Sequence, residues 1–533
     1  MAVNLLFRNA RIVDGTGNPW YRADVAVADG QICGIGHALE AEAAREIDVA
    51  DRVLAPGFID MHAHSDATLL AEPRHEPKVF QGVTTDLIGQ DGLSYAPVTA
   101  PVLDQIRRHL AGLNGDPAAI GWDWTSVGSF LDRFHQHVSV NVAFLVPHNA
   151  VRIGAMGWEQ RTATAAELDC MRQLVAEGMQ DGGFGLSTGL TYPPNEWSNT
   201  EEMVALCEVA ARYGGIYVTH MRGQGDGLLE PLRESIDIAR RAGLPLHISH
   251  LKSSRLGSAR KLEEVIALLD GARAQGLDVT FDSYQYNAGS SMLHSQLPSW
   301  MHVGGPDAEI QRLQSPAVRQ QLRELWHARP PAWTRLHIGS VASDARQWME
   351  GQTLSTLIER SGKDEVDFVC DLLLEENLAV SHVSQGGDTP DDLRELLLQP
   401  LQMMGSDGLL IGGHLHPRTY GTFARVLQKY VREDRVLRLE EAIRKFASFP
   451  AQRLGLTDRG VVKPGMRADL VVFDPEGVCE NATYEQPRLV ASGFTYVAVN
   501  GALVLDQGVH TGATPGHALR HAPRHLEKAK ELR

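Results

Sequence analysis

Short apolar runs alternate with amphipathic segments through most of this chain, and the alternation predicts its architecture. Segments such as 162–181 and 200–213 carry apolar residues three and four positions apart with acidic residues near the start, which is typical of packed helices. Apolar runs that predict strands lie at 57–61, 84–88, 140–145, 183–186, 216–218, 244–248, 278–281 and 402–404. Strands that alternate with helices form a parallel sheet, and eight strands close a (β/α)8 barrel, a TIM-like fold of the α/β class.

Both ends of the chain have a pattern of apolar and polar residues that differs from that of the middle. Residues 4–53 read as short alternating strands separated by Gly and Asp turns, and this pattern returns only at 460–474 and 495–505. We therefore expect a small β-sandwich built from both chain ends. Its two parts span 1–55 and 456–510 and flank a barrel at 56–455, and a C-terminal arm follows at 511–533.

Two connections between the expected strands are too long for one crossover helix. The segment at about 288–341, between the seventh and eighth strands, predicts an inserted lid or subdomain, and residues 98–139 form a smaller insertion. In the tail, His517, His521 and His525 have helical spacing, but Pro523 interrupts it. A solvated arm is expected there rather than a metal site.

Composition narrows the class of protein. The 533 residues, 43% of them hydrophobic, suffice for a large core and more than one structural unit. Sixty-six acidic and 50 basic residues give a net charge of −16, which argues against a nucleic acid or an anionic membrane as partner. We see no signal peptide and no apolar window of about 18 residues, so we expect a cytoplasmic protein. The five cysteines never form a Cys-x-x-Cys pair, which predicts free thiols. The oligomeric state stays undetermined.

Candidate chemistry lies where the expected strands end. In a barrel of this kind the reactive groups sit at the carboxyl ends of the strands. The polar residues found there are His62 and His64 after the first strand, Asp91 after the second, His220 after the fifth, His250 after the sixth and Asp407 after the eighth. Taken alone, each could be a hydrogen-bonded structural histidine or a capping aspartate. Together they are the nitrogen and oxygen donors that suit a zinc-like divalent ion.

Several motifs carry a resemblance to a known family. The runs at 57–64, 219–222, 248–252, 405–408 and 468–474 resemble the metal-dependent amidohydrolase superfamily. Within it, the runs at 185–194, 282–291 and 416–421 are similar to the D-aminoacylases, also called N-acyl-D-amino-acid deacylases. The resemblance continues to the closing run at 511–516, so it covers essentially the whole chain.

The resemblance implies a barrel beside a small β-sandwich, with one tightly held zinc and sometimes a second metal. It assigns the tighter metal to His220 and His250, the weaker one to His62 and His64, and the role of catalytic base to Asp407. Water activated by the metal would attack the amide carbonyl, and Asp407 would accept its proton and return it to the leaving nitrogen.

Position 91 departs from the family pattern. The D-aminoacylases usually place a metal-binding cysteine in a Gly-Asn-Cys-Gly turn, where this chain has Gly-Gln-Asp-Gly at 89–92. A carboxylate is a harder ligand than a thiolate, so we expect weaker selectivity for zinc, and both oxygens of Asp91 could bridge two metals. The alternative is that Asp91 only hydrogen-bonds a ligand histidine. The number of bound ions, one or two, is therefore not determined.

An N-acyl amino acid carries a free carboxylate, which calls for a fixed cation. Arg418 is the best candidate, because a guanidinium can hold a carboxylate with two hydrogen bonds. By resemblance, Tyr192, Lys252, Tyr284 and Ser290 line the same pocket. The alternatives are a surface lysine and buried, packed tyrosines. The preference for D-amino acids comes from the resemblance alone, and the preferred side chain and acyl group are not determined.

Three hypotheses follow. The first is a hydrolase of N-acyl-D-amino acids. The second is a hydantoinase- or dihydropyrimidinase-like hydrolase of cyclic amides; those enzymes bridge their metals with a carbamylated lysine, and no lysine ends an expected strand between 145 and 186. The third is a protein that keeps the same fold but has lost metal binding and catalysis. This hypothesis predicts that metal-ligand residues are missing.

Overall fold

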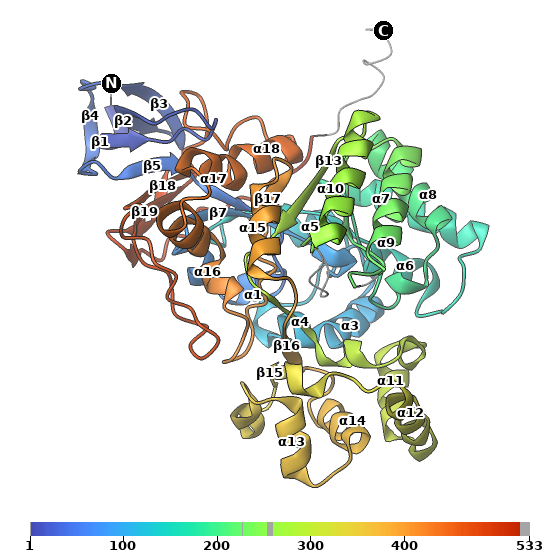
Figure 1. The fold of residues 1–533 in the computed structure, drawn as a ribbon. Coiled ribbons are helices and arrows are strands. Elements are labelled where there is room, and N and C mark those ends of the chain that lie inside the picture. Colours follow the sequence, from blue (N-terminus) through green and yellow to red (C-terminus); the bar gives the residue numbers. More distant parts are fainter. Residues whose placement is uncertain (1, 226, 253–258, 523–533) are drawn as a thin grey trace.

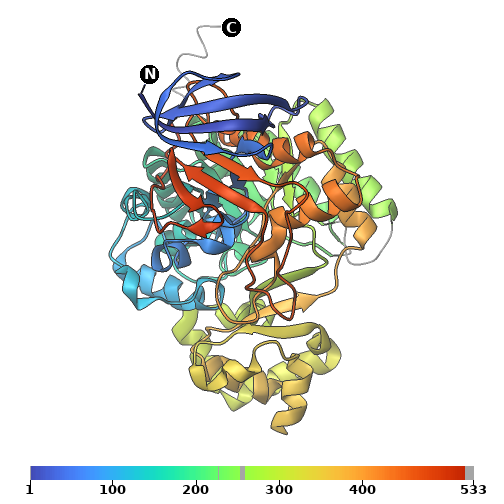
Figure 2. The same cartoon turned by 90° about the vertical axis from the view of Figure 1, so that its left-hand side faces the viewer.

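The two ends of the chain share one mixed sheet. The structure, a computed structural model, describes residues 2–225, 227–252 and 259–522. The sheet contains β1 (Ala2–Ile12), β2 (Tyr21–Ala28), β3 (Gln31–Gly36), β4 (Glu42–Asp48), β5 (Val53–Pro56), β18 (Leu470–Phe473), β19 (Phe494–Val499), β20 (Ala502–Asp506) and β21 (Val509–His510). The ends meet where β5 pairs antiparallel with β18, with Leu54 opposite Val472. Figure 2 shows the blue and red strands side by side. The expectation of one β unit made from both ends is confirmed.

A strand occurs at each of the eight expected places. These are β6 (Phe58–Asp60), β7 (Val83–Ile88), β8 (Asn141–Phe144) continued by β9 (Val146–Pro147), β10 (Gly185–Gly189), β11 (Ile216–His220), β12 (Leu246–Ile248), β13 (Val279–Ser283) and β17 (Gln402–Met404). All pairs are parallel, in a six-stranded sheet ordered β17-β13-β12-β11-β10-β9 and a three-stranded sheet β6-β7-β8. Backbone hydrogen bonds join the two sheets, from Met61 to Met404 at 3.0 Å and from Phe184 to Phe144 at 2.8 Å.

Helices cover the outer face of these strands (Figure 1). The helices packed on the six-stranded sheet include α6 (His148–Met156), α7 (Ala165–Gln180), α8 (Thr200–Arg212), α9 (Leu229–Ala242) and α10 (Ala259–Ala274). The other helices outside the inserted lobe are α1 (Thr68–Ala71), α2 (Glu76–Val79), α3 (Ala100–His109), α4 (Ala111–Asn114), α5 (Val127–Asp132), α15 (Pro390–Leu398), α16 (Arg418–Arg425), α17 (Leu439–Phe446) and α18 (Ser448–Leu454). A capping box begins α7, where the Thr164 hydroxyl accepts from the backbone of Glu167 and the Glu167 carboxylate accepts from Thr164.

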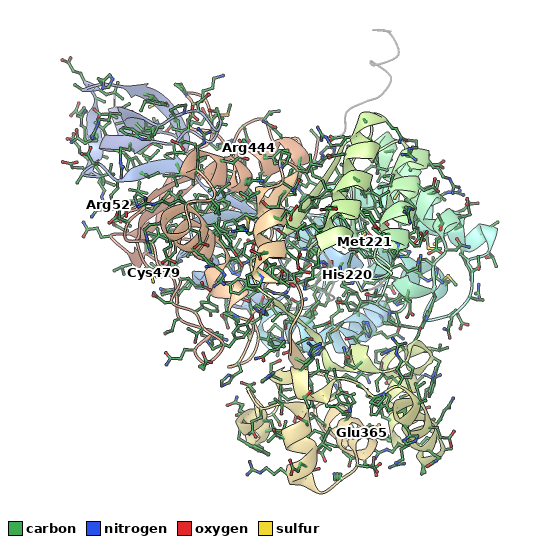
Figure 3. The ribbon with its side chains drawn as sticks, viewed as in Figure 1. Arg52, His220, Met221, Glu365, Arg444 and Cys479 are labelled. Carbon is green, nitrogen blue, oxygen red and sulfur yellow. The ribbon has the colours of Figure 1, made fainter. Side chains whose placement is uncertain are left out.

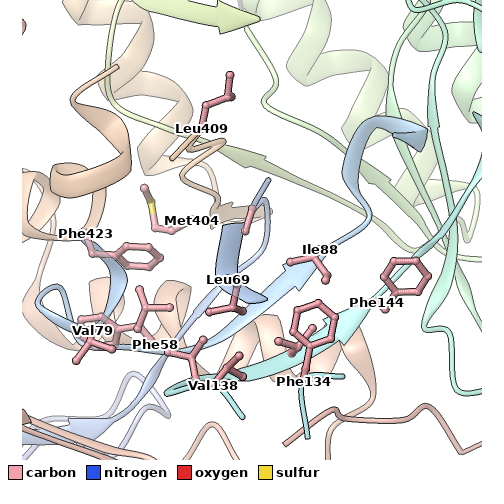
Figure 4. Close-up of a cluster of buried hydrophobic side chains, with 14 of the residues drawn as sticks. Phe58, Leu69, Val79, Ile88, Phe134, Val138, Phe144, Met404, Leu409 and Phe423 are labelled. Carbon is pink, nitrogen blue, oxygen red and sulfur yellow. The ribbon is translucent and has the colours of Figure 1, made fainter. Parts of the chain in front are cut away.

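Phe58 on β6 holds the parallel strands, the helices after β17 and the terminal sheet together. Its ring lies 5.7 Å from that of Phe423, 5.0 Å from Phe446 and 6.4 Å from both Phe473 and Phe494, measured between centroids. Figure 4 shows part of this cluster. Fully burying an aromatic side chain contributes about 2 kcal/mol, so this contact fixes β6, which leads into the candidate site.

The long connection between β13 and β17 forms a separate lobe. It contains β14 (Ala288–Met292), α11 (Gly305–Gln314), α12 (Pro316–Ala328), β15 (Leu336–Ser340), α13 (Leu354–Ser361), α14 (Glu365–Glu375) and β16 (Ser381–Gln385). Its three strands form an antiparallel sheet ordered β14-β16-β15, so the lobe continues past residue 341. It appears in yellow below the barrel in Figures 1 and 2.

The first part of the expected C-terminal arm lies along β8 and the residues before it. Gly516 donates a backbone hydrogen bond to Val138 at 2.8 Å, and Leu519 donates one to Val142 at 2.7 Å. The third histidine of the tail, His525, lies outside the described residues. All five cysteines are free, as expected, and no helix among the described residues is long and apolar enough to cross a membrane.

Candidate metal centre

Six side chains converge where the parallel strands end. They are His62 and His64 after β6, Asp91 in the turn after β7, His220 at the end of β11, His250 after β12 and Asp407 after β17. His220, labelled in Figure 3, is partly exposed, whereas the other five are buried. His62 and His64 follow β6 two positions apart and project to the same side, with their Nε2 atoms 3.3 Å from each other. The structure therefore brings together all six residues expected to bind metal.

Asp91 lies between two groups of histidines. Its Oδ1 is 3.5 Å from His62 Nε2, and its Oδ2 is 3.5 Å from His64 Nε2. The same Oδ2 is 3.6 Å from His220 Nδ1 and 3.6 Å from His250 Nε2. The donor atoms of each group lie within 4.8 Å of one another, and Asp91 belongs to both groups. One carboxylate thus faces two potential metal positions.

Within each group, the imidazole nitrogens lie close enough together to bind one cation. His62 Nε2 lies 3.3 Å from His64 Nε2, and His220 Nδ1 lies 2.9 Å from His250 Nε2. Asp91 Oδ1 is buried and makes no hydrogen bond within the described part of the chain. Burial alone would raise the pKa of Asp91, but His62 and His250 hold it well below its usual range. Converging imidazole nitrogens around an ionised carboxylate fit a divalent ion with nitrogen and oxygen ligands.

Three of the six residues have left-handed backbone conformations. The φ angles are +56° at Asp91, +51° at Asp407 and +32° at His250. Such values cost of order 1–3 kcal/mol at a residue other than glycine, and persist only where the surroundings enforce them. The strain aims these side chains at the centre of the site rather than along their strands.

An outer layer orients the histidines. Asp282 on β13 has one oxygen 3.5 Å from His62 Nδ1 and 3.0 Å from His247 Nε2, and its other oxygen accepts from the backbone of His250 at 2.9 Å. Burial opposes its ionisation, but His62 and His247 lower its pKa to about 2. Sequence reasoning assigned Asp282 no role, although it ends the seventh expected strand. Such partners fix the orientation of a ligand histidine.

Two further residues contact the outer imidazole nitrogens of the second group. Thr191 Oγ1 lies 2.9 Å from His220 Nε2, and the Gln224 side-chain amide lies 2.8 Å from His250 Nδ1. Neither position was singled out from the sequence, because each lies in a loop whose path only the tertiary structure reveals.

Asp407 lies between the first group and an arginine. Its Oδ1 is 3.2 Å from His64 Nε2, and its Oδ2 is 2.8 Å from Arg418 Nη1. Burial favours the protonated form, but Arg418 and His62 hold the pKa of Asp407 well below its usual range. The residue is therefore an ionised carboxylate that can accept a proton.

A cavity of about 440 Å³ opens beside these residues. Its wall includes Tyr192, Lys252, Tyr284 and Ser290, all of which were expected there. Arg418 is not among the described lining residues. It is fully buried, with its guanidinium 4.4 Å from the centre of the Tyr284 ring.

The inserted lobe builds the far wall of the cavity. Ser290 and Ser291 come from β14, Leu336 begins β15, and Arg335 directly precedes that strand. Lys252 Nζ lies 4.9 Å from the centre of the Tyr284 ring, so it faces the same space. The contribution of Arg335 was missed because the sequence does not show how the lobe folds back over the site.

Comparison with known proteins supports this geometry. The Amidohydrolase family model matches residues 45–505. The chain is 34% identical to D-aminoacylase of Alcaligenes xylosoxydans xylosoxydans, over 97% of each chain. It is 32% identical to N-acyl-D-glutamate deacylase of that organism, over 97% of this chain and 96% of the relative. It is 33% identical to N-acyl-D-aspartate deacylase of the same organism, over 97% of this chain and 95% of the relative.

Solved structures show the same similarity. A D-aminoacylase structure has a TM-score of 0.81 at 32% identity, covering 97% of this chain and all of that one; that protein has a binuclear metal centre in which one metal activates and the second attenuates. The structure of N-acyl-D-glutamate deacylase from Bordetella bronchiseptica was solved in complex with zinc and a phosphonate mimic of the tetrahedral intermediate. Its TM-score is 0.81 at 30% identity, and the match covers 98% of this chain and all of that one. A D-hydantoinase structure has a TM-score of 0.57 at 14% identity, covering 98% of this chain and all of that one, so the similarity shows a shared fold alone.

Proposed function

This chain belongs to the amidohydrolase family, and from that premise we propose that it hydrolyses N-acyl-D-amino acids to a carboxylate and the free D-amino acid. The observation that carries the proposal is the position of Asp91, which faces both histidine groups at the edge of the cavity. The similarity to three deacylases of N-acyl-D-amino acids over nearly the whole chain supports the choice of substrate class.

We propose that the site holds one or two divalent ions, with zinc as the first candidate. His220, His250 and Asp91 would hold one ion, and His62, His64 and Asp91 would hold the other. A divalent ion supplies Lewis-acid chemistry, which lowers the pKa of water toward roughly 7 and polarises the amide carbonyl. The chain contributes an ionised carboxylate that faces both groups, and the imidazoles of His220 and His250, whose outer nitrogens lie at hydrogen-bond distance from Thr191 and Gln224.

Asp407 is the proposed general base and acid. Its carboxylate accepts the proton of the attacking water and returns it to the leaving nitrogen, so that the amine departs neutral. The burial of Asp407 excludes competing solvent, and the Arg418 guanidinium beside Oδ2 keeps the group ionised before the reaction.

The substrate carboxylate would bind to cations and hydroxyls of the cavity. Lys252 faces the cavity beside Tyr284, while Tyr192 and Ser290 line it from opposite elements. None of the three guanidinium nitrogens of Arg418 makes a hydrogen bond within the described residues, although Nη1 forms an ion pair with Asp407 at 2.8 Å. We propose that Arg418 holds Asp407 through Nη1 and donates to the substrate carboxylate through the remaining nitrogens.

The same proposal extends to the architecture. We infer that the two parallel sheets act as one (β/α)8 barrel at 56–455, since backbone hydrogen bonds cross between them from Met61 to Met404 and from Phe184 to Phe144. The flanking segments 1–55 and 456–510 would form the companion β domain in a cytoplasmic enzyme.

Metal analysis together with paired substrates tests the function. Purified protein should contain zinc or another divalent metal, and should release amino acid from an N-acetyl-D-amino acid but not from its L enantiomer. Methionine, glutamate and aspartate derivatives would cover the chemistry of the relatives. Equal turnover of both enantiomers, or protein free of metal, would contradict the proposal.

Two variants test the residue roles. Asp407→Asn should abolish turnover while metal content stays nearly unchanged, because only the proton acceptor is lost.

Asp91→Ala should lower metal content in both groups, since the shared carboxylate is removed. Full metal occupancy in Asp91→Ala would reduce Asp91 to a hydrogen-bonding role.

A further inference from the structure

A second group of metal-binding side chains lies outside the site described above. It consists of His109, His294, His302 and Glu309, whose potential ligand atoms lie within 4.8 Å of one another. All four residues are at most 2% exposed. His109 ends α3, while the other three come from the short helical turns 293–296 and 299–302 and from α11 of the inserted lobe.

Hydrogen bonds account for only part of this cluster. Glu309 Oε1 lies 3.0 Å from His294 Nδ1, and Glu309 Oε2 lies 2.9 Å from His302 Nδ1. His109 is different, because neither of its ring nitrogens makes a hydrogen bond among the described residues. Its ring centroid lies 4.8 Å from that of His294 and 6.2 Å from that of His302. A buried imidazole with no partner costs of order 1–3 kcal/mol unless something occupies the space it faces.

The donor set matches a closed, structural metal site. Three imidazoles and one carboxylate provide four ligands, which is the number that tetrahedral zinc requires. At bond lengths of about 2.0–2.1 Å, tetrahedral ligand atoms lie roughly 3.3 Å apart, so the pairs at 2.9 and 3.0 Å need only small outward shifts. The burial of all four residues leaves no open position for a substrate.

We propose that His109, His294, His302 and Glu309 bind a structural zinc ion that clips the inserted lobe to α3. Such an ion would connect residues far apart in the chain and would bind the folded state alone, which raises its stability. The lobe residues close to the cluster, Ser295 and Gln296, line the substrate cavity. The clip would thus set the position of that wall without taking part in catalysis.

The neighbouring contacts fit this role. Trp158 packs edge-on against His109, with ring centroids 4.7 Å apart, and excludes water from that side. An ion pair between Arg108 and Asp307, at 2.6 Å, crosses the same junction between α3 and α11. That pair is exposed at Asp307 and contributes little, so the buried cluster is the stronger candidate for holding the junction.

Zinc content tests the proposal without relying on activity. Glu309→Gln keeps the shape of the side chain but removes the anionic ligand, and should lower zinc by one ion per chain after equilibration with zinc chloride and removal of free metal. Its thermal midpoint should fall, and a chelator should lower that midpoint by less than it does in the wild type, because only the ions of the catalytic centre remain to be removed. Glu376→Gln is the matched control, because Glu376 is a buried carboxylate of the same lobe that hydrogen-bonds Ser343 and lies outside the cluster.

Anomalous diffraction at the zinc edge provides a second measurement on the unmodified protein. A peak between His109, His294 and His302 is expected in crystals grown with zinc. The absence of a peak there, or equal zinc content in Glu309→Gln and Glu376→Gln, would overturn the proposal. Both readouts are independent of the catalytic centre, so they stand whether or not the proposed hydrolase activity is found.

Discussion

At the scale of single residues, Asp91 decides what the site can hold. A carboxylate offers two hard oxygen atoms, and here Oδ1 lies near His62, while Oδ2 lies near His64 of the same group and near His220 and His250 of the other. The thiolate that the D-aminoacylase resemblance would place at this position offers one soft atom. The exchange therefore favours a shared ligand and a weaker preference for zinc over other divalent ions.

Arg418 is predicted to have two separable effects. Arg418→Met removes both the cation beside Asp407 and the donors for the substrate carboxylate, so kcat should fall and KM should rise, each by at least about tenfold for a loss of roughly 1.4 kcal/mol. Arg418→Lys keeps a positive charge near Asp407, and should raise KM more than it lowers kcat. Steady-state kinetics of both variants measures this. An unchanged KM in both would leave Arg418 only the role at Asp407.

Lys445 is predicted to make stability depend on pH. It is fully buried on α17 and donates to the carbonyl of Gln399 at 2.5 Å, and burial lowers its pKa to about 7. Between pH 7 and its usual pKa near 10.4, the unfolded chain binds more protons than the folded chain, so this group makes stability rise with pH.

The comparison with Lys445→Met isolates that effect. From pH 7 to pH 9 the wild type should gain about 2 kcal/mol in free energy of unfolding relative to the variant, as measured by urea titration. A difference between the two proteins that stays constant with pH would show that Lys445 remains charged in its buried position.

At the scale of elements, the turns after the strands place the chemistry. Asp91 follows Gly89, whose φ is +78° and whose amide donates to Asp66 at 3.0 Å. A side chain at this glycine would place its Cβ 2.4 Å from the Leu145 carbonyl oxygen on the next strand. The turn therefore needs both the conformation and the small size of glycine.

Gly89→Ala is expected to displace Asp91. Metal content and kcat/KM should both fall, the latter more than tenfold, because the turn must shift to relieve the contact with Leu145. Gly157→Ala is a matched control: φ there is +68°, but no atom lies within 4 Å of the added Cβ. The control should cost about 1 kcal/mol of stability and leave metal content unchanged. Equal metal content in the two variants would contradict this account.

At the scale of the whole molecule, the terminal β unit and the parallel strands meet at Asp469. Its carboxylate accepts from Asn141 on β8 at 3.0 Å and from the backbone of Asn500 at 2.6 Å, and it pairs with the buried Arg459. Its backbone carbonyl accepts from Gly57, just before β6. Asp469, which directly precedes β18, thus connects the sheet built by both ends to β6 and β8.

Asp469→Ala should destabilise the protein strongly. Removing this carboxylate leaves Arg459 buried beside an empty position, which costs about 3 kcal/mol or more in free energy of unfolding. Asp458→Ala removes the other carboxylate that pairs with Arg459, but Asp458 is 49% exposed, so its loss should cost less than about 1 kcal/mol. Urea unfolding of the two variants compares them, and similar losses would argue against a joining role for Asp469.

The amino-acid sequence by itself determined the positions of the parallel strands, the union of both ends in one sheet and the six candidate metal ligands. Local hydrophobic periodicity marks a buried strand, and the rule that reactive groups gather at the carboxyl ends of barrel strands turns each strand end into a neighbour of the others. His62, Asp91 and Asp407 were therefore found together without any structure.

Only the tertiary structure decided how those residues face one another. Asp91 lies between both groups, and Arg418 turns to Asp407 behind Tyr284 instead of lining the cavity. The cluster around Glu309 likewise joins His109 to a lobe that follows much later in the chain. Such contacts depend on long-range packing and on strained turns, and neither leaves a periodic pattern in the sequence.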